Sequence, residues 1–193
     1  MTEPLLIGRR WRIVSPGTPA AAGRVDIVLT PGAFGSGEHE TTASCLEVLE
    51  TRPEVHDATV LDLGSGTGVL ALAALRLGAR AATCVDTSPG AVETARANGL
   101  LNDLDQSLRH LAGTIADVQD RDYSLVIANL YGDLLLELAD AIVGSTRAGG
   151  LILLSGMLWE YWFDVNQRFE RLGCQQLEHR MLDEFATLLL KKS

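Results

Sequence analysis

The stretch VLDLGSGTGVLALAALRLGA, Val60–Ala79, decides the fold. It begins as a short apolar run, passes through three closely spaced glycines, and continues as a longer apolar run that ends at Gly78. A strand, a glycine turn and a helix in this order are typical of a crossover unit between parallel strands. We therefore predict that the backbone turns sharply at Gly64, Gly66 and Gly68, between a strand and a helix.

The same alternation of strand and helix continues downstream. A second helix is predicted over Ser88–Gly99, with Ser88 as its cap, Pro89 at its first position and Gly99 at its end. Parallel strands are expected at Thr59–Leu63, Ala81–Val85, Leu108–Ala112, Tyr123–Asn129 and Leu151–Ser155. Further helices are expected at 133–143 and Leu158–Leu172. The final segment, 174–192, is expected to form two antiparallel strands. These elements predict an α/β fold: a doubly wound, mostly parallel seven-stranded sheet that is covered on both faces.

The first fifty residues precede this pattern. Two short apolar runs, Trp11–Val14 and Val25–Leu29, flank a turn-rich segment and are predicted to form an amino-terminal hairpin. A glycine-rich loop and a helix over Thr41–Glu50 follow. We expect one domain over 1–193, in which residues 1–52 supply the hairpin, the loop and the first helix, and residues 53–193 the core.

Composition narrows the possible functions. The chain has 193 residues, 47% of them hydrophobic, and a formal net charge of −9. This charge disfavours tight binding to DNA or RNA, which depends on neutralising phosphates. The only lysines are Lys191 and Lys192, so Schiff-base chemistry and a Walker-type phosphate site have no lysine in the body of the chain. We expect no metal ligands.

The most apolar segment is interrupted by Arg76 and Arg80, and the amino terminus lacks the pattern of a signal peptide. No membrane partner is therefore expected. The three cysteines lie far apart and form no CxxC motif, which favours reduced thiols and a cytoplasmic location.

A nucleotide-like cofactor is predicted at the carboxyl ends of the strands. Asp86 follows Gly64 by 22 residues, at the end of the second strand, where an acid can hydrogen-bond ribose hydroxyls. The glycine spacing is GxGxG instead of the dinucleotide GxGxxG, and Asp62 precedes it. A carboxylate there repels a pyrophosphate but attracts an ammonium group, which favours S-adenosylmethionine over a nicotinamide cofactor. Alternatively, Asp62 only orients the loop through backbone amides.

Asn129 ends the strand Tyr123–Asn129, beside the same crevice. Its side-chain oxygen, with its own carbonyl or that of Leu130, can hold the hydrogens of an amine and aim the nitrogen lone pair. Adenine-amino methyltransferases carry prolines after this asparagine, whereas Leu130, Tyr131 and Gly132 follow here, which disfavours a nucleic-acid base as acceptor. Alternatively, Asn129 is an ordinary turn residue at the strand end.

Five segments together, AFGSGEHETT, VLDLGSGTGVLALAALRLGA, VDTSP, VIANLY and AGGLILLSGML, resemble the PrmA family from about Pro4 to Gly173. These are class I, Rossmann-like methyltransferases that modify amino groups of ribosomal protein L11. The resemblance implies S-adenosylmethionine as cofactor and an S-adenosylmethionine-dependent N-methyltransferase activity. The implied acceptor is a protein amine, such as an amino group of a ribosomal protein. It also implies a catalytic role for Asn129 and a cofactor site formed by Phe34, Thr42, Asp62, Gly64, Gly66, Asp86 and Asn129.

The loop Pro31–Thr42 is expected to lie against the cofactor as a pliable lid. Its helix start, Thr41–Thr42, would offer free amides to the cofactor carboxylate. His39 is a candidate general base, because histidine titrates near neutral pH. We expect it instead to brace the loop between Glu38 and Glu40.

Members of the family carry a separate amino-terminal domain that holds the ribosomal substrate, and this chain is expected to begin near the end of the linker. Another acceptor, a small-molecule amine or a different protein, therefore remains an alternative, as do a nicotinamide-dependent reductase and an idle cofactor-binding module. The aromatic cluster Met157–Phe163 is a candidate docking surface. We expect Trp159 or Tyr161 to be exposed there, and Leu158, Trp162 and Val165 to lie in the core.

Overall fold

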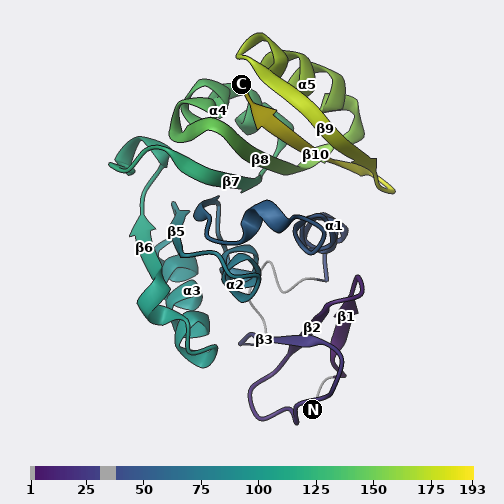
Figure 1. The fold of residues 1–193 in the computed structure, drawn as a ribbon, viewed down its shortest axis with the longest axis vertical. Coiled ribbons are helices and arrows are strands. Elements are labelled where there is room, and N and C mark those ends of the chain that lie inside the picture. The colour runs from purple at the N-terminus through teal and green to yellow at the C-terminus, as the bar shows by residue number, and fades with distance from the viewer. Residues whose placement is uncertain (1–2, 31–37) are drawn as a thin grey trace.

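The structure is a computed structural model, and it describes residues 3–30 and 38–193. A seven-stranded sheet forms its centre (Figure 1). In spatial order its strands are β6 (Leu108–Ala112), β5 (Ala81–Asp86), β4 (Thr59–Leu63), β7 (Tyr123–Asn129), β8 (Thr146–Leu158), β10 (Phe185–Lys192) and β9 (Cys174–Met181). Strands β6 to β8 are parallel, and β10 is antiparallel to both of its neighbours. The predicted α/β architecture is confirmed.

Helices cover both faces of this sheet. They are α1 (Glu40–Leu49), α2 (Val69–Arg76), α3 (Pro89–Leu101), α4 (Gly132–Ser145) and α5 (Trp162–Arg171), with short 3-10 turns η1 (Pro53–Val55), η2 (Asp105–Ser107), η3 (Ile115–Asp117) and η4 (Trp159–Tyr161). Side chains alternate between the faces: Val60 and Ile127 pack into the core below α1 and α2, whereas Leu61 and Val126 pack into the core below α4 and α5. Both cores consist of apolar strand residues, as expected for parallel strands buried on both sides.

Helix α3 begins as predicted but ends later. Ser88 caps it, its hydroxyl accepting a hydrogen bond from the Ala91 amide at 3.4 Å, and Pro89 is its first residue. The expected end at Gly99 is wrong, because the helix continues to Leu101. Gly99 is buried, and a Cβ there would lie 2.8 Å from Leu108 Cδ1. This glycine therefore allows α3 to pack closely on β6.

The amino-terminal strands form a separate three-stranded sheet: β1 (Leu5–Ile7), β2 (Trp11–Val14) and β3 (Val25–Val28). The hairpin lies between β1 and β2, whereas β3 is parallel to β2. The expected pairing of the two longer runs as a hairpin is thus wrong, since the ten-residue connection returns the chain to the start of β2. Buried Trp11 docks this sheet on α1, donating from Nε1 to the Leu46 carbonyl at 2.9 Å.

The carboxyl-terminal region differs from expectation at one junction. Strand β8 continues through Leu158, a 3-10 turn follows, and α5 begins only at Trp162. Leu158 is consequently 40% exposed instead of buried, whereas Val165 is fully buried as expected. Trp162 is half-buried and Trp159 is exposed, so the expected exposure at this cluster is confirmed for Trp159.

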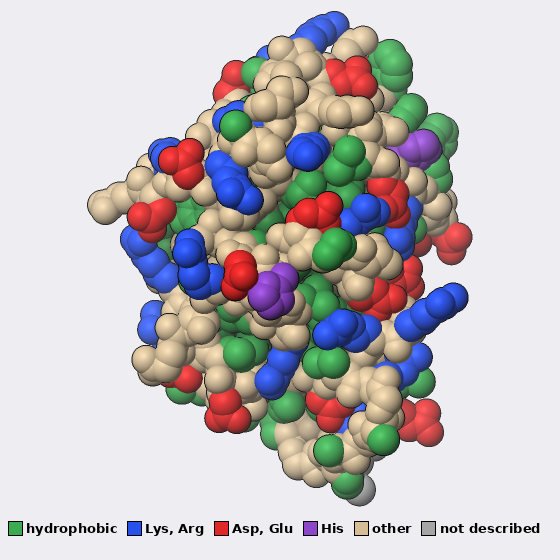
Figure 2. Space-filling view, in the orientation of Figure 1, with side chains coloured by type: hydrophobic (Ala, Val, Ile, Leu, Met, Phe, Trp, Pro, Cys, Tyr) green, Lys and Arg blue, Asp and Glu red, His purple; other side chains and the backbone are tan. Residues whose placement is uncertain are grey.

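Cys45, Cys84 and Cys174 are buried free thiols. Within residues 3–30 and 38–193, no helix has the length and apolar character needed to cross a bilayer. Basic and acidic side chains are interspersed over the face shown in Figure 2.

Candidate functional site

The glycine turn and Asp86 lie together at the carboxyl ends of β4 and β5. Asp86 Oδ2 accepts a hydrogen bond from the Gly66 amide at 3.0 Å, and Oδ1 accepts one from the Ser88 amide at 2.9 Å. These bonds fix the carboxylate beside the turn, and the side chain remains half-exposed. Oxygen lone pairs that point away from the backbone stay available for ribose hydroxyls.

Gly64 lies where the turn approaches the end of β7. Its φ is +69°, in the left-handed region, and a Cβ would lie 2.5 Å from Leu130 Cδ2. Any larger residue would therefore strain the backbone and displace Leu130. The structure thus places the glycine turn directly beside the residue that follows Asn129.

Asp62 is buried under the same turn, with 1% of its surface exposed. Its Oδ2 accepts a hydrogen bond from the Ala71 amide, in the first turn of α2, at 3.2 Å. The pKa of Asp62 is raised to about 7: burial raises it most, the hydrogen bond from the Ala71 amide lowers it, and the neighbouring Asp86 carboxylate adds a smaller rise. The bond to Ala71 matches the alternative in which Asp62 orients the loop. The coupling to Asp86 identifies this end of the sheet as a place that disfavours added negative charge.

Thr42 and Asn129, predicted from distant parts of the sequence, lie in contact. Asn129 Nδ2 donates to Thr42 Oγ1 at 3.3 Å, joining the end of β7 to the start of α1. Thr42 is buried and Asn129 is half-buried. This bond orients the Asn129 amide. Among residues 3–30 and 38–193, nothing donates to its amide oxygen, Oδ1, which leaves the lone pairs of that oxygen open to a bound amine.

Gly156 is a site residue that the sequence analysis did not single out. It follows the core part of β8, with a φ of +80°. A Cβ there would lie 2.7 Å from Asn129 Oδ1, 2.8 Å from the Leu130 carbonyl oxygen and 2.9 Å from the Leu130 nitrogen. Only glycine leaves room for the Asn129 amide in this position. The only sign of this role in the sequence is that a glycine follows the apolar run Leu151–Ser155. An isolated glycine at a strand end occurs for many structural reasons, so it does not by itself indicate a site residue.

The start of α1 differs from expectation. His39 is the N-cap: its Nδ1 accepts from the Thr41 amide at 3.4 Å, and its carbonyl accepts from the Thr42 amide at 3.1 Å. The predicted free amides of Thr41 and Thr42 are therefore already occupied. The His39 ring also packs edge-on against Phe185, with 5.0 Å between the ring centroids. It braces the helix start, while the Glu40 carboxylate accepts from backbone amides of the turn between β9 and β10.

Phe34 and the three lid glycines, Gly32, Gly35 and Gly37, lie outside the described residues. Their predicted contacts with a cofactor stay predictions. Among residues 3–30 and 38–193, no three side chains of the metal-ligating types converge.

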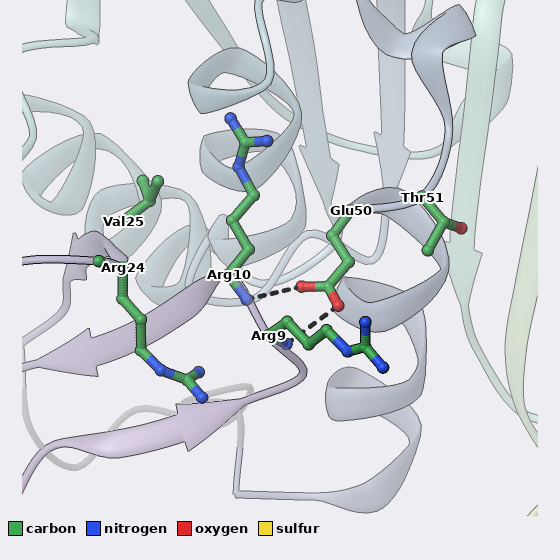
Figure 3. Close-up of a pocket in the computed structure, with 7 residues that line it drawn as sticks. Arg9, Arg10, Arg24, Val25, Glu50 and Thr51 are labelled. Atoms are coloured by element: carbon green, nitrogen blue, oxygen red, sulfur yellow. Dashed lines mark hydrogen bonds between the residues drawn. The ribbon is translucent and has the colours of Figure 1, made fainter.

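A pocket of about 520 Å³ lies elsewhere, between the amino-terminal sheet and the end of α1 (Figure 3). Both Glu50 oxygens accept backbone amides there, those of Arg9 and Arg10, each at 3.0 Å. The guanidinium of Arg24 donates to three backbone carbonyls, and the arginine side chains point in different directions. We interpret these contacts as structural, since they hold the β1–β2 turn on α1.

The comparisons with known proteins decide the family. The family model described as "Ribosomal protein L11 methyltransferase (PrmA)" matches residues 1–193. The chain belongs to the PrmA family. A ribosomal protein L11 methyltransferase of Clostridium botulinum (strain Eklund 17B / Type B) is 36% identical over 99% of this chain and 59% of its own length. That of Pelobacter propionicus is 40% identical over 92% of this chain and 59% of its own length.

Solved structures agree with the family assignment. The crystal structure of a ribosomal protein L11 methylase from Lactobacillus delbrueckii subsp. bulgaricus superposes with a TM-score of 0.88 at 25% identity, covering 100% of this chain and 99% of that one. SMU.776, a putative methyltransferase complexed with SAH, shares the fold with a TM-score of 0.69 at 17% identity, over 80% of this chain and 50% of that one. This PrmA-family chain spans just over half the length of the curated relatives it matches.

Proposed function

We propose that this chain is an S-adenosylmethionine-dependent N-methyltransferase whose acceptor is an amino group of a protein. The observation that carries the proposal is the hydrogen bond between Thr42 and Asn129, which orients the Asn129 amide beside the glycine turn. Family membership supports it, because the relatives are named ribosomal protein L11 methyltransferases. A ribosomal protein is accordingly the first acceptor to test, and a cytoplasmic location goes with it.

The side chains at the carboxyl ends of β4 and β5 fit S-adenosylmethionine. Gly64 lets the turn pass close to Leu130 at the end of β7, and Asp86 presents carboxylate oxygens to a ribose. A dinucleotide would bring a pyrophosphate towards Asp62 and Asp86. Burial raises the pKa of Asp62, and repulsion from the Asp86 carboxylate adds to that rise, so a further negative charge is disfavoured there. A cofactor that carries an ammonium and a sulfonium group brings compensating positive charge. This argues against a nicotinamide-dependent reductase.

S-adenosylmethionine, when bound, supplies a methyl group on a positively charged sulfur, and its transfer to an amine nitrogen leaves S-adenosylhomocysteine and a released proton. The chain's own contribution is to position the amine. Asn129 Oδ1 and a nearby backbone carbonyl accept its N–H groups and so direct the nitrogen lone pair. The amine must arrive neutral, although a free lysine has a pKa of about 10.4. Partial burial at Asn129 lowers that pKa, because the charged form loses hydration.

A small-molecule amine as acceptor is the second candidate. It would use the same Asn129 amide and the same cofactor site as a protein amine. The two candidates differ in what becomes labelled when the enzyme is supplied with radioactive S-adenosylmethionine: a ribosomal protein fraction or a low-molecular-weight amine. An idle cofactor-binding module would label neither.

Calorimetric titration with S-adenosylmethionine, S-adenosylhomocysteine and NADH tests the cofactor. We expect the first two to bind and NADH not to bind, and we expect Asp86→Ala to weaken the first two by about tenfold, since a hydrogen bond to a charged group is lost. The matched control is Glu54→Ala, which removes an exposed acid in η1. Clear NADH binding, or equal affinities in both variants, would contradict the assignment.

A further inference from the structure

Four segments meet around Asn129, and together we call them the site mouth: Glu38–Thr42, Asn129–Asp133, Gly156–Asp164 and Met181–Phe185. They come from the start of α1, the end of β7, the end of β8 with η4, and the turn between β9 and β10. No cofactor contact predicted from the sequence involves the last two segments. Their surface therefore needs a separate explanation.

Specific contacts hold these segments together. Beyond the bond between Thr42 and Asn129, the Glu40 carboxylate accepts from the Glu184 amide at 3.4 Å. The Trp159 amide in turn donates to the Glu184 carbonyl at 3.0 Å. These contacts place the four segments next to one another, on the side of the molecule where β7 ends at Asn129.

The charge of this surface has one sign. The four segments contain Glu38, Glu40, Asp133, Glu160, Asp164, Asp183 and Glu184 but no lysine or arginine. All 16 lysine and arginine residues of the chain lie outside these four segments. Because the formal net charge of the whole chain is −9, most of its acidic excess lies at the mouth. Such a surface attracts cationic partners and repels nucleic acid.

The same surface exposes large apolar side chains. Nine large hydrophobic residues are exposed among the described residues, and five of them belong to the site mouth. These five are Tyr131 (77% exposed), Phe163 (60%), Trp159 (55%), Met181 (52%) and Leu158 (40%). Apolar groups that cluster among charged ones mark interaction surfaces, and tryptophan and tyrosine are enriched among residues that dominate binding energies.

We propose that the site mouth docks a basic polypeptide segment, in which apolar residues flank the amine that reaches Asn129. The acidic side chains match the charge of such a segment, and Trp159, Phe163 and Tyr131 offer it an apolar contact surface. A small free amine would use neither feature. The inference rests on the proposed function and deepens it by naming the substrate class.

The test is fluorescence anisotropy with two labelled peptides of about fifteen residues, each with a single lysine between leucine and phenylalanine. One carries arginines at its outer positions and the other carries glutamates. With S-adenosylhomocysteine present, we expect the basic peptide to bind at least about tenfold more tightly, with an affinity that falls as salt rises. We expect Trp159→Ser and Glu160→Lys each to weaken it by about fivefold or more.

Leu100→Ser and Glu54→Lys are the matched controls, since Leu100 is 58% exposed on α3 and Glu54 lies exposed on η1. They make the same kinds of change away from the mouth and should leave the affinity within twofold. Equal binding of the two peptides, or equal losses in mouth and control variants, would overturn the proposal. Peptide binding needs no turnover, so a failure of the proposed function would appear separately, as absent binding of S-adenosylmethionine.

Discussion

Gly156→Ala is expected to lower kcat for methyl transfer by about a hundredfold, because misplacing a positioning group by 1 Å can have that effect. The new methyl group would lie 2.7 Å from Asn129 Oδ1 and 2.8 Å from the Leu130 carbonyl oxygen, so both acceptors must move. The measurement is steady-state transfer of a radioactive methyl group to a ribosomal protein fraction. The affinity for S-adenosylmethionine, measured by calorimetry, should change much less than kcat.

The chain offers a matched control in the same strand. Gly149 also lies in β8 and has a φ of +71°, but a Cβ there meets nothing within 4 Å. Gly149→Ala therefore introduces similar backbone strain, about 1–2 kcal/mol, without displacing Asn129. The loss in kcat for Asn129→Ala combined with Gly156→Ala should be smaller than the product of the two single losses, since both changes disturb the Asn129 amide and only the displacement of the Leu130 carbonyl is separate. Comparable losses in Gly149→Ala, or additive losses in the double variant, would show that Gly156 does not act through Asn129.

The fold was predictable because its signals are local and repeated. Buried parallel strands are continuous apolar runs, as at Leu125–Ala128, and each is separated from the next helix by glycine or a capping residue such as Ser88. Pairing in the small sheet was not predictable in this way. Strand β1 has only three residues, and its turn to β2 is marked by a single glycine, so the longer runs appeared to be natural partners.

For the candidate site, the sequence predicted which residues take part but not which contacts they make. Thr42 and Asn129 were both named, and the structure brings them into contact. The predicted free amides at the start of α1 failed because a histidine at the N-cap can accept a hydrogen bond as the usual short polar residues do. The clash that makes Gly156 indispensable is a tertiary contact between β8 and the end of β7. No single-sequence pattern contains that distance.

Asp62→Asn is expected to change stability and cofactor affinity in opposite directions. Asparagine keeps an oxygen that can accept the Ala71 amide, but it removes a carboxylate that burial holds at a pKa of about 7. The ordinary pKa of aspartate is about 3.9, so the folded state binds this proton more tightly than the unfolded state. The contribution of Asp62 to the stability of the wild type should therefore be greatest below pH 4, fall as the pH rises from about 4 to about 7, and stay reduced above that range.

Thermal unfolding of both proteins between pH 5 and pH 9 measures this contribution. The free energy of unfolding of the variant, relative to that of the wild type, should increase up to about pH 7 and stay constant above it. The raised pKa of Asp62 makes this difference on the order of a few kcal/mol. At pH 8, its affinity for S-adenosylmethionine should be at least about tenfold weaker, because a buried charge opposite an ammonium group is lost. A stabilised variant with unchanged affinity would mean that Asp62 only holds the start of α2. An unstabilised variant would mean that the carboxylate is ionised without penalty in the fold, and that its burial is already compensated.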